Sequence, residues 1–151
     1  MLRLAALALL ACVLPAPTSA QVSVVGARDL QFGFVALGVP TVVLPTDAVK
    51  SGQWTLTAPV GTRIQIRLTP PNQLLGPAGA TMPVNFQNGD VFVQGTWSGA
   101  LQEFFNPNAT KNFRFTGGTQ AILRLGGQVT PAGNQSTGPY ANTVVCTINV
   151  N

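Results

Sequence analysis

The sequence predicts an all-β protein, an immunoglobulin-like antiparallel sandwich of two sheets with about seven to nine strands. Short segments alternate apolar and polar residues, which is the period that a half-buried strand requires. Turn residues separate these segments roughly every 8–12 positions. Beyond residue 20 no segment has the period of a helix. Together these three features favour a β-sandwich.

The first element along the chain is an expected export signal at residues 1–20. Arg3 precedes an apolar run at residues 4–14, and the small residues after it suit cleavage before Gln21. The run is shorter than the roughly 20 residues that span a bilayer. A second interpretation stays open, because the residues before Cys12 resemble a lipoprotein box that ends in an acylated cysteine. In either case we expect an exported protein, located in the periplasm, at the cell surface or outside the cell.

Residues 21–151 are expected to form one domain, since a chain of this length buries enough apolar surface without disulfides or metals. The full chain has eight basic and four acidic residues, a formal net charge of +4. The basic residues are scattered and form no phosphate-binding stripe, so we expect no nucleic-acid partner. Cys146 has no cysteine partner in this domain and shares an apolar face with Val144 and Ile148, which indicates a buried, slowly reacting thiol.

The strands expected in the first half of the domain lie at residues 22–25, 30–34, 39–44, 53–58 and 63–68. The last of these has the clearest alternation. Ile64, Ile66 and Leu68 face the core there, and the polar residues between them face water.

Asn88-Gly89 is the strongest hairpin signal, because both residues readily adopt the positive φ of a two-residue type I′ turn. The expected register pairs Gln87 with Asp90, Phe86 with Val91 and Val84 with Val93. In this register one apolar face continues across both strands.

The second half of the domain begins with residues 96–108, for which we expect an irregular loop with a short helical turn near residues 101–105. Strands follow at 113–115 and 121–125, and an apolar, alternating strand at 142–150 completes the sheet. The predicted core consists of Ile64, Ile66, Leu68, Val84, Phe86, Leu123, Val144 and Ile148.

The residue types do not indicate an enzyme. The chain has no histidine, the commonest metal ligand and general base. The four carboxylates, Asp29, Asp47, Asp90 and Glu103, lie in turn-like or solvated contexts and do not suggest a converging pair. No glycine-rich loop leads into a Lys-Ser or Lys-Thr pair that would cradle a phosphate. We therefore expect no catalytic residue, no cofactor and no metal site.

Two groups of aromatic residues are candidates for binding. In Lys111-Asn112-Phe113-Arg114-Phe115 the pattern favours two buried phenylalanines over an RNA-binding strand. Trp97 is surrounded by small residues, and an aromatic side chain in such a loop could stack on a sugar or contact a partner. The alternative for Trp97 is a side chain folded back over the edge of the sandwich.

Several motifs in order resemble a known family. They are Asp29-Leu30-Gln31-Phe32-Gly33, Gly52-Gln53-Trp54-Thr55-Leu56 followed by Gly61-Thr62-Arg63-Ile64, Gly126-Gly127-Gln128-Val129-Thr130-Pro131, and Gly138-Pro139-Tyr140. The set resembles a bacterial secreted family catalogued as domain of unknown function 4402. That family is similar in layout to archaic chaperone-usher pilins and to spore coat protein U, so the resemblance implies an immunoglobulin-like sandwich at a bacterial surface.

Two classes of function remain. The first is a structural subunit, pilin-like or coat-like, which assembles with itself or with other surface subunits by β-augmentation. Val22 and Val24, in the N-terminal segment, are its candidate interaction residues. The alternative is a monomeric secreted binding module that uses the loop at residues 96–108 and Trp97.

Overall fold

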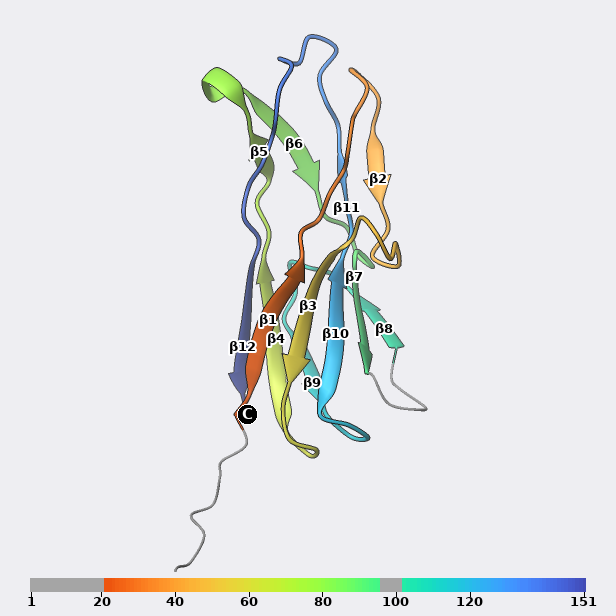
Figure 1. Cartoon of the computed structure of the whole chain (residues 1–151), viewed down its shortest axis with the longest axis vertical. Coiled ribbons are helices and arrows are strands. Elements are labelled where there is room, and N and C mark those ends of the chain that lie inside the picture. The colour runs from red at the N-terminus through yellow and green to blue at the C-terminus, as the bar shows by residue number, and fades with distance from the viewer. Residues whose placement is uncertain (1–20, 96–101) are drawn as a thin grey trace, which may run out of the picture.

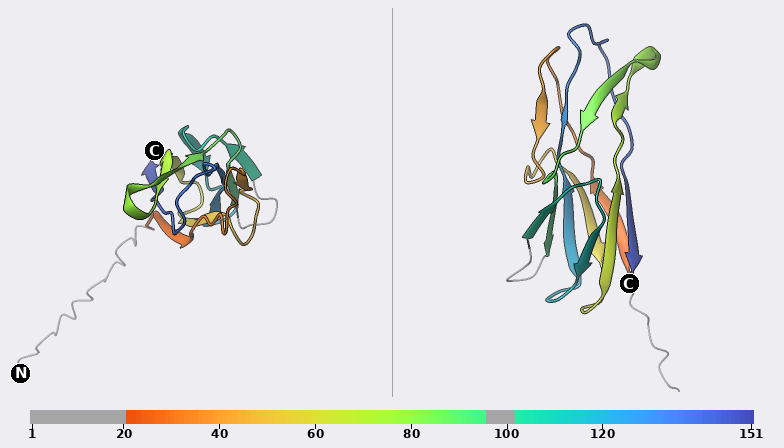
Figure 2. Two further views of the ribbon diagram at one scale, coloured as in Figure 1. Left: turned by 90° about the horizontal axis from the view of Figure 1, so that it is seen from above. Right: turned by 180° about the vertical axis from the view of Figure 1, so that it is seen from behind.

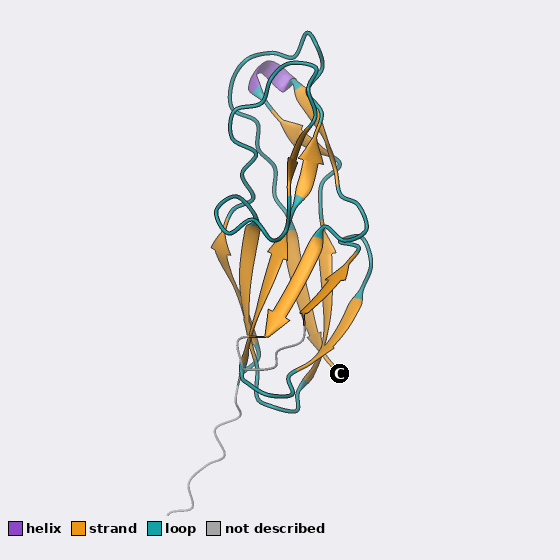
Figure 3. Ribbon diagram, turned by 90° about the vertical axis from the view of Figure 1, so that its right-hand side faces the viewer, coloured by secondary structure: helices purple, strands orange, loops and turns teal. Residues whose placement is uncertain are grey.

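The computed structural model describes residues 21–95 and 102–151 and shows an all-β protein, as predicted. Its strands form three antiparallel sheets of five, four and three strands. The molecule is elongated, with the five- and three-stranded sheets at one end and the four-stranded sheet at the other (Figure 1). Figure 3 shows that loops dominate the end that holds the four-stranded sheet.

The strand order of each sheet is as follows. The five-stranded sheet has the order β1 (Ser23–Arg28), β3 (Gly52–Thr57), β10 (Gln120–Leu125), β7 (Val91–Gly95) and β8 (Gln102–Phe105). The three-stranded sheet has the order β12 (Val145–Val150), β4 (Arg63–Thr69) and β9 (Lys111–Arg114). The four-stranded sheet has the order β2 (Thr41–Val43), β11 (Gly127–Val129), β6 (Thr81–Asn85) and β5 (Gln73–Leu75), and a short 3-10 turn, η1 (Pro77–Gly79), joins β5 to β6.

The strands are more numerous than the sequence suggested, because stretches of chain that begin in one sheet continue in another. The chain leaves β4 of the three-stranded sheet and enters β5 of the four-stranded sheet within a few residues. In the same way β10 of the five-stranded sheet is separated from β11 only by Gly126. The four-stranded sheet is thus an extension of the sandwich, not a separate domain.

The main core lies between the five- and three-stranded sheets. The predicted inward residues of β4, Ile64, Ile66 and Leu68, are buried there, and so is Leu123 of β10. Phe113 and Phe115 are buried beside them with their rings 5.2 Å apart, edge to face, while Arg114 points to water. These burials confirm the core assignment for the middle of the sandwich.

The hairpin register predicted around Asn88-Gly89 is wrong, and so is the type I′ turn, because Gly89 has a positive φ but Asn88 does not. Gly89 has φ of +93°, and the N–H of Asp90 donates to the carbonyl of Gln87 at 3.2 Å. The flanking strands do not pair, because the chain crosses here from the four-stranded to the five-stranded sheet. Val84 therefore lies opposite Val129, and Val93 lies between Leu123 and Glu103.

The helical turn expected near residues 101–105 is also wrong, because residues from Gln102 onward form β8. This strand pairs with β7, with Phe105 opposite Val91 and Phe104 opposite Phe92. Phe105 enters the main core, and the rings of Phe104 and Phe92 are tilted by 43° with centroids 4.8 Å apart. These cross-strand pairs between β8 and β7 thus favour a strand over a helical turn.

The stretch expected to form a strand at residues 30–34 is not a strand. Gly33 has φ of +70°, a conformation that ends the alternation of Leu30, Phe32 and Phe34. The segment instead runs along the outside of the four-stranded sheet, and the N–H of Gln31 donates to the carbonyl of Lys50 at 2.8 Å.

The last strand is shorter than predicted, since β12 begins at Val145. It pairs with β4 along its whole length, with Ile148 opposite Ile66. Val144 and Ile148 are half-buried against the main core, as is Phe86, which packs against both the main core and the four-stranded sheet. The end of β12 lies beside the start of β1, at the lower end of the molecule (Figures 1 and 2).

Cys146 lies on β12 opposite Leu68 and is half-buried, so it is more exposed than the sequence suggested. Burial raises the pKa of its thiol from 9.0 to about 11, because the charged thiolate is poorly solvated there. The thiolate is the reacting form. We therefore expect labelling of native protein by a neutral thiol reagent to accelerate about tenfold per pH unit from about pH 8 to 10. Intact-mass spectrometry over time measures the rate.

The same shift gives the folding equilibrium a pH dependence. The unfolded thiol loses its proton near 9.0, whereas the folded one keeps it until about 11. The contribution of Cys146 to stability is therefore complete below pH 9.0 and is lost as the pH rises through about 11. In the labelling experiment, a rate that stops rising well below pH 11 would contradict the raised pKa of the Cys146 thiol.

Candidate binding groove

A groove of about 1410 Å³ lies over the four-stranded sheet in the described part of the chain. Residues 26–35 and Leu37 form one wall, and residues 135–144 form the other. Figure 1 shows the first wall rising from the end of β1 and the second descending toward β12. Beyond Arg28, the end of β1, neither wall belongs to a named strand, so the face of the four-stranded sheet between the walls is left partly open.

The floor of the groove is a second apolar cluster, separate from the main core. Met82 and Val84 of β6 and Val129 of β11 are buried at its centre. The half-buried side chains packed around them are Phe32, Val35, Leu74, Phe86 and Tyr140. The half-buried apolar and aromatic side chains around this buried cluster therefore provide the surface that an occupant would contact.

Tyr140 is the best-anchored side chain in the wall formed by residues 135–144. Its hydroxyl donates to the carbonyl of Ser136 at 2.9 Å and accepts from Nε2 of Gln135 at 2.6 Å. The Gln135 amide also donates to the carbonyl of Thr81 at 3.1 Å. Gly76 leaves room for the ring, since a Cβ there would lie 2.3 Å from Cε1 of Tyr140. The ring is thus fixed by both hydrogen bonds and packing.

The rest of this wall is tied to the edge of β5. Ala141 and Leu75 exchange two backbone hydrogen bonds of 2.9 Å, and Nδ2 of Asn142 donates to the carbonyl of Gln73 at 2.8 Å. These bonds hold the wall in place without making it a strand.

The groove is nearly free of charge, because Arg28 and Asp29 are the charged residues that line it. The Arg28 guanidinium faces the loop before β3, where Nε donates to the carbonyl of Ser51 at 2.7 Å and Nη2 donates to its hydroxyl at 2.9 Å. Since Arg28 is engaged there, Asp29 is the remaining charged residue of the lining, and the groove presents a largely apolar surface.

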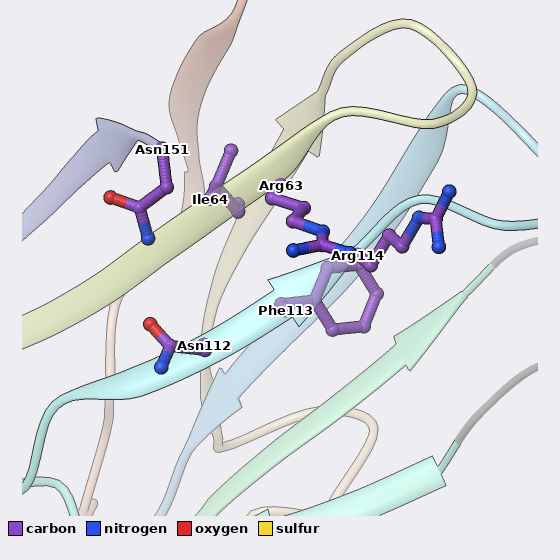
Figure 4. Close-up of a pocket in the computed structure, with 6 residues that line it drawn as sticks. All are labelled: Arg63, Ile64, Asn112, Phe113, Arg114 and Asn151. Atoms are coloured by element: carbon purple, nitrogen blue, oxygen red, sulfur yellow. The ribbon is translucent and has the colours of Figure 1, made fainter.

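A second, smaller hollow of about 350 Å³ lies at the lower end of β4 and β9. Its lining residues are Arg63, Ile64, Asn112, Phe113, Arg114 and Asn151. Arg63 and Arg114 are directly opposite each other in the register of the two strands. Figure 4 shows their side chains extending from neighbouring strands, with Asn112 and Asn151 at the other end of the hollow. This hollow contains hydrogen-bond donors and amides but no carboxylate or thiol.

The interaction residues expected from the sequence lie elsewhere. Val22 and Val24 are half-buried against the main core, with Val24 opposite Leu56 in the pairing of β1 with β3, and neither lines the groove. Trp97 lies outside the described residues. Within the described ranges, no group of three or more histidine, cysteine, aspartate or glutamate side chains could hold a metal ion.

The groove was not predicted, although the sequence contains a signal for it. A turn-rich stretch that includes Gly138-Pro139-Tyr140 runs from residue 131 to residue 143. Such a stretch cannot pair continuously, so an apolar sheet face beside it is expected to stay partly uncovered.

Comparisons with known proteins do not identify a relative. No family model matches the chain, and neither a curated protein nor a solved structure matches it. In the described residues no helix is long and apolar enough to cross a membrane.

Proposed function

We propose that this protein is a non-enzymatic structural subunit of an exported bacterial assembly, and that its copies associate through an exposed strand edge. The observation that carries the proposal is the difference between β2 and the other edge strands of the described residues. Native proteins protect sheet edges with charges, bulges or covering segments, because an open edge pairs with other chains.

Charged side chains protect one side of the sandwich. Glu103 of the edge strand β8 forms an ion pair with Lys111 of the edge strand β9. Arg114 adds a second positive charge to β9 and is exposed. A neighbouring strand would have to desolvate these charges, so this side disfavours pairing with another chain.

The remaining edges, apart from β2, are bulged or covered. The pairing of β1 shifts in register between Gly26 and Arg28, and β1 lies beside β12 on the same side of the sandwich. The edge of β5 is covered by the wall segment through the bridge between Leu75 and Ala141.

The edge strand β2 has no charged residue, no bulge and no paired covering segment, and its protection is limited to its short length and the prolines beside it. It pairs with β11 on one side, and Val42 and its neighbours Val39 and Leu44 are exposed. No charged residue occurs from residue 30 to residue 46. Pro40 and Pro45 flank the strand and keep it short, so side-chain burial has to contribute alongside backbone pairing.

The carboxylates support a non-enzymatic role. Asp47 accepts the backbone N–H groups of Lys50 and Val49, which lowers the pKa of its carboxyl below 3.8. Asp90 accepts the N–H of Gln87, and Glu103 is paired with Lys111. Three of the four acidic residues of the chain thus have structural partners, and none of them lines the groove.

An exported, bacterial location is supported by two sequence features. Residues 1–20 have the pattern of an export signal, and the motifs from Asp29 to Tyr140 resemble the secreted family named above. The similarity of that family to pilins and coat proteins also favours assembly over a monomeric binding module.

The test is the oligomeric state of residues 21–151 in sedimentation velocity, from about 1 to several hundred micromolar, the range in which weak interfaces populate. We expect oligomers that grow with concentration, and we expect Val42→Lys to reduce them because a lysine at an edge disfavours pairing. Val60→Lys is the matched control, since Val60 is exposed to a similar extent at the turn before β4. A wild-type protein that stays monomeric throughout would contradict the proposal and favour the binding module.

A further inference from the structure

Phe34 is the most exposed large apolar side chain in the described residues, with a relative exposure of 109%. It lies in a loop that is bracketed by Gly33 and Gly38, both with φ of +70°, a conformation that other residues rarely adopt. The N–H of Gly38 donates to the carbonyl of Pro131 at 3.1 Å, which anchors the loop to the body of the molecule. A folded loop therefore presents Phe34 to solvent.

An exposed phenylalanine in isolation would need no explanation, but Phe34 belongs to a segment that contains several exposed apolar residues. Leu37 and Val39 follow it along the chain, and Val42 and Leu44 lie at the β2 edge. All lie within the uncharged stretch at residues 30–46. A surface of this kind is typical of a protein interface.

The size of the groove favours a segment of protein as its occupant. Pockets for small molecules generally enclose about 300–1,000 Å³. The groove is larger, at about 1410 Å³, and its floor at Met82, Val84 and Val129 is apolar. An occupant that covers the half-buried side chains around this floor has to be largely apolar and longer than a single small ligand.

A second copy of this chain has these properties. Phe34 is itself one of the residues that line the groove, so the projecting ring and the hollow lie on the same face. A face that carries both a projection and a complementary hollow can pair with itself about a two-fold axis. Because the stretch at residues 30–46 is uncharged, two positively charged copies can meet there without opposing like charges.

On the basis of the structural role proposed above, we propose that the groove binds the Phe34 loop of a second copy, reciprocally, so that each copy places its Phe34 in the groove of the other. This contact is separate from the β2 edge, which uses Val42. Two different two-fold contacts give every copy two neighbours, so the assembly grows beyond a dimer.

Four proteins test this arrangement in sedimentation velocity: the wild type, Phe34→Asp, Val42→Lys and the double variant. We expect species larger than dimers for the wild type, dimers for each single variant and monomers for the double variant. Phe34→Asp should weaken the groove contact about 30-fold or more, as truncation of a central interface residue does. Val60→Asp, at an exposed position on the opposite end of the molecule, should assemble like the wild type.

A second measurement asks whether the groove is the acceptor. Met82 is the one methionine in residues 21–151, and its side chain is part of the groove floor. In the Val42→Lys background we expect its methyl NMR signal to shift as the protein dimerises, and we expect no shift in the double variant. Dimerisation without a shift of that signal would overturn the groove as the contact.

The outcomes separate the two proposals. If Phe34→Asp assembles like the wild type while Val42→Lys does not, the groove contact is wrong and assembly through the β2 edge stands. If the wild type is monomeric, both are wrong. Thermal melts of each variant check the fold, and both substituted side chains are exposed, so loss of folding is not expected.

Discussion

Replacing Ile66 with alanine is expected to lower the free energy of unfolding by about 2–5 kcal/mol. Ile66 is fully buried in the central strand of the three-stranded sheet, opposite Ile148 on one side and Lys111 on the other. Truncation removes apolar contacts and leaves a cavity that neighbours on both sheets cannot fill without shifting. Urea denaturation at low protein concentration measures the loss, because assembly would otherwise add to the apparent stability.

Val150→Ala is the matched control for this measurement. Val150 lies on the neighbouring strand β12, opposite Ile64, and is 61% exposed. Its truncation is expected to change the free energy of unfolding by less than about 0.5 kcal/mol. A loss of similar size for the two variants, or a loss below about 0.5 kcal/mol for Ile66→Ala, would mean that Ile66 is not part of the core.

The burial of Ile64, Ile66 and Leu68 could be predicted from the sequence because it depends on a local property. Because side chains alternate between the two faces of a strand, the sequence shows which of them share a face. If one face is buried, the apolar set points toward the core. The same reasoning applies to Leu123 and to the phenylalanines at 113 and 115. In each case the residues of one strand contain the information.

Strand partners could not be predicted in this way, and the segment around Val84 shows why. Its alternation is compatible with pairing to Val93, and the Asn88-Gly89 turn makes that hairpin locally favourable. The structure instead pairs Val84 with Val129, more than forty positions away. The apolar side chains of Val84 and Val93 are compatible with pairing in either sheet. Contacts with distant parts of the chain therefore determine which sheet each strand joins.

The groove was beyond prediction for a related reason. Its walls have no repeating pattern, and their positions depend on contacts between distant residues, such as the ring of Tyr140 against Gly76. A glycine in a loop predicts a turn, but it does not reveal that an aromatic ring from another segment occupies the space where its side chain would be.

Gly126 is a further glycine whose role is visible only in three dimensions, and replacing it with alanine is the second substitution with a large expected effect. Gly126 connects β10 to β11 at the point where the chain changes sheets. A Cβ at this position would lie 2.3 Å from the carbonyl oxygen of Val43 and 2.7 Å from the backbone nitrogen of Pro45. Backbone atoms cannot rotate away, so the end of β2 has to move.

We expect Gly126→Ala to lower the free energy of unfolding by about 1–3 kcal/mol, the usual range for overpacking a closely packed position. Because the clash displaces β2, we also expect weaker self-association through that edge. Gly133→Ala is the control, since a Cβ there meets nothing within 4 Å. Denaturant melts and sedimentation velocity measure the two effects. If Gly126→Ala matches Gly133→Ala in both, β2 is not held against the β10–β11 connection, and the exposed edge proposed for assembly is not preformed in the monomer.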